Sequence, residues 1–385
     1  MERLVAKYAD KLVGAGLAES GAPLVGGLDA ELVWNRVDPL SHLFEEVFTA
    51  LNINSLLYCR PREPYASIID YLATHSDGVI RPRDSETRTF LHDLPVAAKL
   101  SSSAVAKAFM SRKCVIVPGG GIAAFGTVSP EQAFVVFSSV CFACYVKFHV
   151  DYLHAFRLGK MDPQARRIIE MSLSSSEPSA AKKDAPPKGP YLNEEQVHHA
   201  MVQTGRFMVE HRLVDSFFGN ISYLAGDTLY ISQTGSSLDE LEGCIDPCPV
   251  DGSLSTGITA SSELTAHLRI VKETDHRSIL HGHPKFPVIL SLDCDETDCA
   301  LDGQCHIRCP KERFIADIPV VPGEVGTGPH GLCHTLPPAI NGKRGVIVYG
   351  HGLFTTGKSD FIAPFANMKA IEEACKKQFL ARAGF

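Results

Sequence analysis

Three histidines have the spacing of a metal site. The segment His281-Gly282-His283 follows a short apolar stretch that is typical of a β-strand. Alternate residues of a strand project to the same side, so both imidazoles can face one ion. A third histidine, His351, follows another β-branched stretch. Three protein ligands with one open coordination position are typical of a catalytic zinc, and these residues therefore form a candidate divalent-metal site.

A carboxylate and several hydroxyl groups lie upstream of the histidine pair. Ser261-Ser262-Glu263 opens an amphipathic segment, and Ser261 has the residue type and position of a helix N-cap. If this helix N-terminus faces the metal, Glu263 is a candidate acid/base, and the first amides and serine hydroxyls form an anion site. Two further turns are rich in hydroxyl and amide groups, and they contain Asn220, Thr234 and Gly235.

The elements that must position these residues belong to the second half of the chain. Residues 172–191 are rich in Ser, Ala, Lys and Pro without apolar periodicity, which predicts a flexible linker. This linker separates a first domain, residues 1–171, from a second, residues 192–385. The 385 residues are enough for about two domains, each with its own core.

The two halves resemble each other. Residues 115–126 match residues 346–357 without a gap, and residues 55–61 match residues 278–284. In each match a predicted strand enters a turn. The positions of the three histidines hold other residues in the first half, namely Tyr58, Arg60 and Gly120. We therefore interpret residues 1–171 as a degenerate copy of the second domain, without metal ligands and with a structural or oligomerisation role.

Composition excludes some partners. The chain has 37 Lys and Arg against 44 Asp and Glu, a formal charge of −7, so no basic excess favours nucleic-acid binding. The most apolar run, residues 133–146, is shorter than the ~20 residues of a membrane span and predicts a core segment. The first ten residues alternate charged and apolar side chains, unlike a secretory signal. We expect a cytoplasmic protein whose twelve cysteines are reduced or metal-bound.

The order of these motifs resembles a known superfamily. Five features follow one another: GNIS at 219–222, TG at 234–235, SSE at 261–263, HGHP at 281–284 and HGLFTTG at 351–357. Together they resemble the class II, zinc-dependent sugar-phosphate aldolases of the aldolase/adducin superfamily. The likeness covers residues 195–375 approximately. It implies an α/β fold with three layers, α/β/α, around a mainly antiparallel sheet, in two tandem related domains.

The resemblance also implies roles for individual residues. His281, His283 and His351 would hold Zn²⁺ or another divalent metal, and Glu263 would be the catalytic acid/base. The residues expected to bind a substrate phosphate are Asn220, Thr234, Gly235, Ser261 and Ser262. The implied reaction is aldol cleavage of a phosphorylated ketose or related hydroxy-carbonyl compound through a metal-stabilised enediolate. The implied assembly is a homo-oligomer with its site near an interface.

Other functions on the same scaffold stay open. The aldolases of this superfamily use tyrosines in the loop before the last strand and at the C-terminus, and residues 321–327 and 381–385 contain none. Glu324 and His330 are the alternatives for proton delivery. Metal-dependent decarboxylation, dehydration or epimerisation are rival reactions, although the epimerase branch usually has Asp where Glu263 stands. A non-catalytic assembly role, as in the adducins, is the rival from another class.

Four cysteines lie within 16 residues between the second and third histidines. They are Cys294, Cys299, Cys305 and Cys309. Four thiolates are a common structural zinc set, although the spacing lacks paired CxxC motifs. Bound zinc, an iron–sulfur cluster and unliganded or redox-active thiols all remain open.

Overall fold

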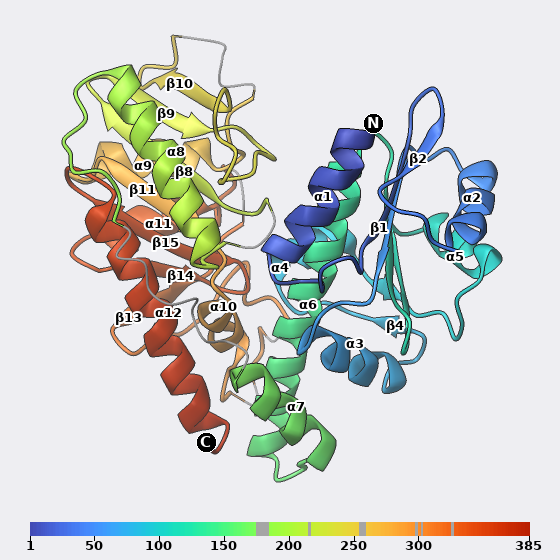
Figure 1. Cartoon of the computed structure of the whole chain (residues 1–385). Helices are drawn as coiled ribbons and strands as arrows, with labels where there is room; N and C mark the ends of the chain where they lie inside the picture. Colours follow the sequence, from blue (N-terminus) through green and yellow to red (C-terminus); the bar gives the residue numbers. More distant parts are fainter. Residues whose placement is uncertain (175–184, 215–216, 254–258, 297–298, 302, 325–326) are drawn as a thin grey trace. The chain divides into compact units, whose positions relative to one another are not determined.

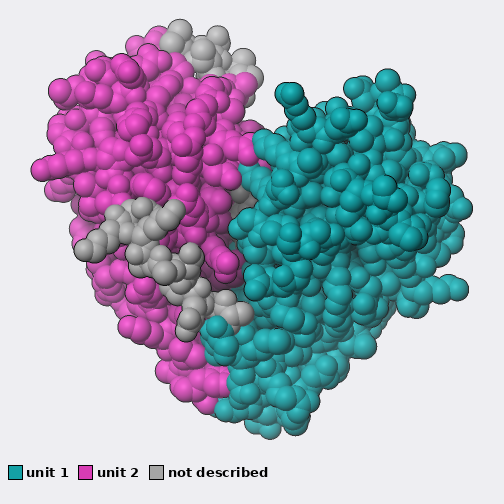
Figure 2. Space-filling view, in the orientation of Figure 1, with its two compact units in different colours: residues 1–177 teal, residues 178–385 magenta. Residues whose placement is uncertain are grey.

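The chain forms two compact units, residues 1–177 and 178–385 (Figure 2). The computed structural model describes residues 1–174, 185–214, 217–253, 259–296, 299–301, 303–324 and 327–385. The division falls within the predicted linker, of which residues 175–184 lie outside the described residues. The two ends of that linker are ordered, because a helix continues to Ser174 and Tyr191 is buried against Tyr223.

Unit 1 contains a five-stranded antiparallel sheet with the order β2-β1-β3-β7-β6. Its strands, and those of a separate hairpin formed by β4 and β5, are β1 (Leu24–Leu28), β2 (Leu32–Trp34), β3 (Ser55–Cys59), β4 (Val79–Ile80), β5 (Leu94–Pro95), β6 (Cys114–Val117) and β7 (Gly121–Gly126). Its helices are α1 (Glu2–Gly14), α2 (Ser41–Ala50), α3 (Tyr65–Thr74), α4 (Ser85–Leu91), α5 (Ser102–Phe109), α6 (Pro130–Arg157) and α7 (Pro163–Ser174). Helices α2 and α5 pack on one face of the sheet, and α1 and α6 pack against its strands with α3 beside α6 (Figure 1).

Helix α6 corrects one expectation from the sequence. It contains 28 residues, so it is long and apolar enough to cross a membrane, although the apolar run 133–146 alone is too short. Its most apolar window is 89% buried inside the structure, as in the core helix of a globular unit. The core interpretation of this segment therefore agrees with the packing, while the length argument was wrong. Among the described residues it is the one helix that meets these criteria.

Unit 2 contains an eight-stranded sheet with the order β10-β9-β8-β11-β15-β14-β13-β12. Its strands are β8 (Asn220–Ala225), β9 (Thr228–Ser232), β10 (Ile245–Pro249), β11 (Ser278–Gly282), β12 (Arg313–Ile315), β13 (Ile318–Val321), β14 (Val346–Val348) and β15 (Gly352–Gly357). All neighbouring strands are antiparallel except β13 and β14, which are parallel. The prediction of a mainly antiparallel central sheet is confirmed.

Helices cover both faces of the unit 2 sheet (Figure 1). They are α8 (Glu194–Glu210), α9 (Leu264–Glu273), α10 (Lys285–Leu292), α11 (Leu332–Ile340) and α12 (Ile362–Arg382). On one face, α9 and α11 form a core with β11, β14 and β15 that includes Ile270, Leu336 and Phe354. On the other face, Met208 of α8 and Met368 of α12 approach Gly282 of β11. Unit 2 is therefore a three-layer α/β/α structure, as predicted.

The two sheets share a pattern of strand neighbours. Five adjacent strands of the unit 2 sheet lie in the order β9-β8-β11-β15-β14, and the five strands of the unit 1 sheet lie in the order β2-β1-β3-β7-β6. Within each set of five, the neighbours follow the same order relative to the chain, and all neighbouring pairs are antiparallel. Strand β10, which has no counterpart in the sheet of unit 1, extends the unit 2 sheet beyond β9. The interpretation of unit 1 as a degenerate copy stays a prediction, because a shared strand order does not by itself establish duplication.

Candidate metal centre

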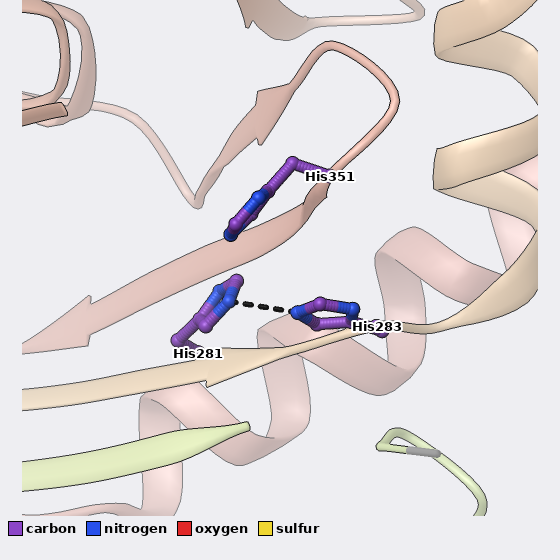
Figure 3. Close-up of side chains that lie close together, drawn as sticks. All are labelled: His281, His283 and His351. Atoms are coloured by element: carbon purple, nitrogen blue, oxygen red, sulfur yellow. Dashed lines mark hydrogen bonds between the residues drawn. The ribbon is translucent and has the colours of Figure 1, made fainter. Parts of the chain in front are cut away.

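The three histidines come from two neighbouring strands. His281 lies in β11, where its backbone pairs with Phe354 of β15. His283 follows β11 directly, and His351 occupies the turn between β14 and β15 (Figure 3). Gly350 in that turn has a φ of 60°, a conformation that glycine adopts without steric cost. The antiparallel pairing therefore brings the end of β11 and the start of β15, and with them all three imidazoles, to one place.

The imidazoles converge on a common point. One ring nitrogen from each histidine lies within 4.8 Å of the other two. The Nε2 atoms of His281 and His283 are 2.9 Å apart (Figure 3). All three side chains are buried, with exposures of 1%, 1% and 4% for His281, His283 and His351. Burial, together with the nearby His281 and His351, lowers the pKa of His283 well below its ordinary value, which favours the neutral imidazole that binds metals.

Backbone and aromatic groups fix the orientation of the rings. The Nδ1 atom of His281 lies 3.3 Å from the carbonyl oxygen of Leu353, and the Phe354 ring stacks on His281 at 4.1 Å between centroids. A Cβ atom at Gly352 would lie 2.7 Å from Cε1 of His281 and 3.0 Å from Cδ2 of His283. Only a residue without a side chain fits there. Such outer contacts set the ring orientation and tautomer of metal-binding histidines.

Glu263 completes the group. It is the N-cap residue of α9, and its carboxylate lies 2.9 Å from Nε2 of His351 and 3.6 Å from Nε2 of His281. Asn220 donates a hydrogen bond from Nδ2 to Glu263 at 2.7 Å. Burial raises the pKa of Glu263, but the two histidines and Asn220 outweigh it and hold that pKa well below its ordinary value.

These residues fit a divalent cation. Three buried imidazoles beside a carboxylate form a donor set that suits zinc and similar ions. The side-chain oxygen Oδ1 of Asn220 is also buried without a hydrogen-bond partner in the structure, as expected for a group that faces a site rather than the core. Among the described residues, the three histidines are the one group with three or more ligand atoms in common reach.

The structure brings the predicted anion-binding residues to the edge of this centre. The Ser262 amide donates to the Thr234 hydroxyl at 3.0 Å, and the Glu263 amide approaches the Ser261 hydroxyl at 3.3 Å. Thr234, Gly235 and Ser262 are exposed, whereas Ser261 is buried. Two details differ from expectation. Helix α9 starts at Leu264 with Glu263, not Ser261, as its N-cap, and the Asn220 amide contacts Glu263.

Sequence reasoning gave no role to a second buried pair beside the centre. The Ser222 hydroxyl lies 2.7 Å from Nδ1 of His267, and burial lowers the pKa of His267 to about 4. The sequence signal that could have indicated this pair is the periodicity of each segment. Ser222 shares a strand face with Asn220, and His267 lies one helical turn after Glu263. Of the alternatives for proton delivery, Glu324 is exposed and His330 is half-buried.

Comparisons with known proteins agree with this architecture. Residues 199–379 match the family model "Class II Aldolase and Adducin N-terminal domain". An L-fuculose phosphate aldolase from Methanococcus maripaludis strain C7 is 27% identical over 169 residues, covering 42% of this chain and 84% of that protein. Another, from Methanocaldococcus jannaschii, is 27% identical over 179 residues, covering 46% of this chain and 91% of that protein. The crystal structure of L-fuculose-1-phosphate aldolase from Thermus thermophilus is 21% identical, with a TM-score of 0.40 and coverage of 49% of this chain and 95% of its own.

The sheet, the helical layers and the family match define unit 2 as a class II aldolase-like α/β domain. The family match covers residues 199–379, which all lie in unit 2. Class II aldolases are in general metal-dependent enzymes, in agreement with the donor set described above.

Proposed function

We propose that this protein is a divalent-metal-dependent aldolase that cleaves a phosphorylated ketose or a related hydroxy-carbonyl compound. The observation that carries the proposal is the convergence of three buried imidazole nitrogens within 4.8 Å with a carboxylate in hydrogen-bond contact with one of them. An assembly protein has no physical need for such a buried donor set, because uncompensated buried polar groups are costly. The proposal therefore favours catalysis over an adducin-like role.

His281, His283 and His351 would hold the cation. A divalent ion there, most simply Zn²⁺, would polarise the ketone oxygen of the substrate and stabilise the negative charge that develops as the carbon–carbon bond breaks. Glu263 is the one carboxylate that contacts the described centre, and it would move the proton between the substrate hydroxyl and the carbanion carbon. Asn220 fixes the position of that carboxylate through its amide.

The phosphate group of the substrate would bind beside the start of α9. Thr234, Gly235, Ser261 and Ser262 supply hydroxyl and amide groups there, and their mutual contacts place them at one edge of the centre. The N-terminus of a helix attracts anions because its first amides have no partners within the helix. The side-chain amide of Asn220 donates one hydrogen bond to Glu263. Asn220 would therefore have two roles, to position this carboxylate and to bind the phosphate.

We further propose that the protein acts as a homo-oligomer with the site near an interface, with a small phosphorylated molecule rather than nucleic acid or membrane as its partner. Light scattering of the active protein tests the assembly. A mass of two or more chains supports it, and a fully active single chain refutes it.

Product analysis tests the reaction. The metal-loaded protein is incubated with a panel of phosphorylated ketoses and hydroxy acids, and released aldehyde is detected through a coupled alcohol dehydrogenase. We expect aldehyde in proportion to substrate consumed. Consumption without aldehyde, with release of CO₂, loss of water or inverted stereochemistry, would replace cleavage by decarboxylation, dehydration or epimerisation. No turnover by any of these routes would favour the assembly role.

A further inference from the structure

The start of α9 is joined to strand β8 by two side-chain hydrogen bonds. Asn220 donates from Nδ2 to the Glu263 carboxylate at 2.7 Å, and the Ser222 hydroxyl lies 2.7 Å from Nδ1 of His267. All four side chains are buried. The second contact lies two residues farther along β8 and four residues farther along α9 than the first. The candidate acid/base therefore has a neighbouring contact between the same two elements.

The spacing of the two contacts fixes the position of α9 along β8. Residues two apart in a strand are separated by about 6.4–6.8 Å along it, and residues four apart in a helix by about 6 Å along its axis. Asn220 and Ser222 therefore match Glu263 and His267 in spacing, so both contacts form at once. A displacement of the helix start that separates Glu263 from Asn220 would have to break the second contact as well.

The pair of Ser222 and His267 is polar at the edge of an apolar layer. Leu224, the next residue on this face of β8, packs against a core cluster that includes Ile270 of α9. Nε2 of His267 is buried without a hydrogen-bond partner among the described residues. Burial of polar groups costs free energy, and an unpaired nitrogen adds to that cost. The pair is therefore a poor choice for stability alone, which indicates a role in fixing one arrangement of helix and strand.

Both elements that this pair joins lead to the metal centre. In the antiparallel pairing of β8 with β11, Asn220 lies opposite His281. The His267 ring packs edge-on against Phe354 at 6.0 Å between centroids, and Phe354 stacks on His281. The His267 amide also donates to the Glu263 carbonyl at 3.1 Å. His267 is thus linked through single contacts to the candidate acid/base and to the aromatic ring that supports a candidate metal ligand.

We propose that Ser222 and His267 are positioning residues, whose contact fixes the start of α9 so that the Glu263 carboxylate stays beside His281 and His351. Neither would touch the substrate. The inference rests on the proposed role of Glu263 as acid/base, but the position that it assigns to the start of α9 does not depend on the reaction. Loss of the contact would let the carboxylate move, while the histidines, which lie in other elements, stay in place.

The first test compares three variants of the full chain with the wild type, each loaded with Zn²⁺ and assayed for aldol cleavage. Ser222→Ala removes the hydroxyl, and His267→Phe keeps a ring against Phe354 without the hydrogen bond. His267→Asn keeps a hydrogen-bonding atom near the position of Nδ1. We expect kcat to fall about 10–100-fold in the first two, as for other contacts that orient the groups of a site. His267→Asn should lie between His267→Phe and the wild type, and zinc content should not change.

A second hydroxyl–imidazole pair of unit 2 supplies the matched control. The Thr356 hydroxyl in β15 lies 3.0 Å from Nδ1 of His276, which follows the far end of α9. Thr356→Val should lower the Tm about as much as Ser222→Ala does but leave kcat unchanged. Equal losses of kcat in both variants would show general destabilisation, and a normal kcat in Ser222→Ala would show no role in positioning. Either result would overturn the proposal.

Combination with Glu263→Gln shows whether the pair acts through Glu263. If it does, Ser222→Ala should lower the residual kcat of Glu263→Gln far less than it lowers that of the wild type, because residues that act as a unit have non-additive effects. Equal fold losses in the two backgrounds would show that the pair acts by another route, and this result would also overturn the proposal.

Hydrogen exchange provides a readout that needs no activity. The Ala266 and His267 amides donate to the Glu263 carbonyl, and in Ser222→Ala they should exchange at least about tenfold faster than in the wild type, because local opening sets their exchange rates. Amides of β14 and β15 should keep their rates. Unchanged exchange in α9, or equal acceleration throughout unit 2, would contradict the proposal. A wild type that cleaves no substrate would refute the proposed function, while this measurement would still decide whether the pair fixes the start of α9.

Discussion

The Glu263 carboxylate lies 2.9 Å from Nε2 of His351, although the two residues are 88 positions apart in the sequence. Because a carboxylate only accepts hydrogen bonds, the imidazole is the donor in this contact. The start of α9 and the β14–β15 turn therefore meet at one point, and the candidate acid/base touches a candidate metal ligand.

Removing the charge of Glu263 should abolish most activity without removing the metal. Glu263→Gln keeps the shape and a hydrogen-bond acceptor for Asn220 but cannot exchange a proton, so we expect kcat to fall about 10²–10⁴-fold. The measurements are aldehyde release and zinc content. Glu273→Gln, on an exposed position at the end of the same helix, is the control and should have normal kcat. Equal activity in both variants would remove Glu263 from the mechanism.

Gly352 should tolerate no side chain. In Gly352→Ala the new methyl group would press on the Gly282 carbonyl, 2.6 Å away, and on the His281 ring, 2.7 Å away. We expect the rings to move and metal affinity to fall by about 10–100-fold, as for other contacts that orient metal-binding histidines. Competition with a fluorescent zinc chelator measures this. Gly328→Ala, where a Cβ meets nothing within 4 Å, should leave affinity unchanged, and the same result for Gly352→Ala would contradict the packing.

The Thr234 hydroxyl should matter to a phosphorylated substrate and not to the metal. Its oxygen accepts a hydrogen bond from the Ser262 amide at 3.0 Å, and Thr234→Val removes it with little change of shape. Loss of a hydrogen bond to a charged group costs about 1.5–3 kcal/mol, which corresponds to a KM increase of about 10–100-fold. Inorganic phosphate should also inhibit the wild type more strongly than the variant. A KM within about twofold of wild type would place the phosphate elsewhere.

Asp84 in unit 1 should make stability depend on pH. Burial raises its pKa to about 6, although Thr87 donates hydrogen bonds to it from the backbone amide and the hydroxyl. The folded state therefore binds a proton that the unfolded state, with an ordinary pKa near 3.8, releases. This contribution is complete below about pH 4 and is lost as pH rises through about 6, by at most about 3 kcal/mol for two pKa units.

Asp84→Asn isolates that effect, because the amide is always neutral and still accepts from the Thr87 backbone amide. The difference in Tm between the variant and the wild type should shift in favour of the variant between pH 4 and pH 7. A difference that is constant with pH would show that Asp84 has an ordinary pKa. The position lies outside unit 2, so catalytic measurements do not enter the test.

The sequence names the three histidines and Glu263 as one candidate site, and the structure places these four residues together. The alternation of His281 and His283 along a strand, and the glycine-flanked His351, indicate candidate ligands because strand periodicity is local. The sequence could give Glu263 its role only on the condition that the start of α9 faces the histidines. That condition depends on where α9 begins relative to the sheet, which spacing in the sequence does not determine. The resemblance to the aldolases supplied the layer order, which periodicity cannot give.

Other features escaped prediction for physical reasons. The Ser222–His267 pair forms across the interface of β8 and α9, and no spacing in either segment alone identifies it. Residues 133–146 are too short for a membrane span by themselves, but the charged residues that follow belong to the same helix, α6. Most of that helix is buried in the unit 1 core, and the length of its apolar run alone does not indicate this packing.

The proposed metal centre is tested by comparing the metal content of the wild type with that of His281→Ala/His283→Ala. Zinc per chain is measured by elemental analysis after purification without chelator, with His199→Ala, an exposed histidine of unit 2, as the control. We expect the double variant to bind one divalent ion fewer than the wild type and to lose aldol cleavage, while the control keeps its metal and its activity. Equal metal content in the wild type and the double variant would contradict it, because the three histidines would then hold no ion.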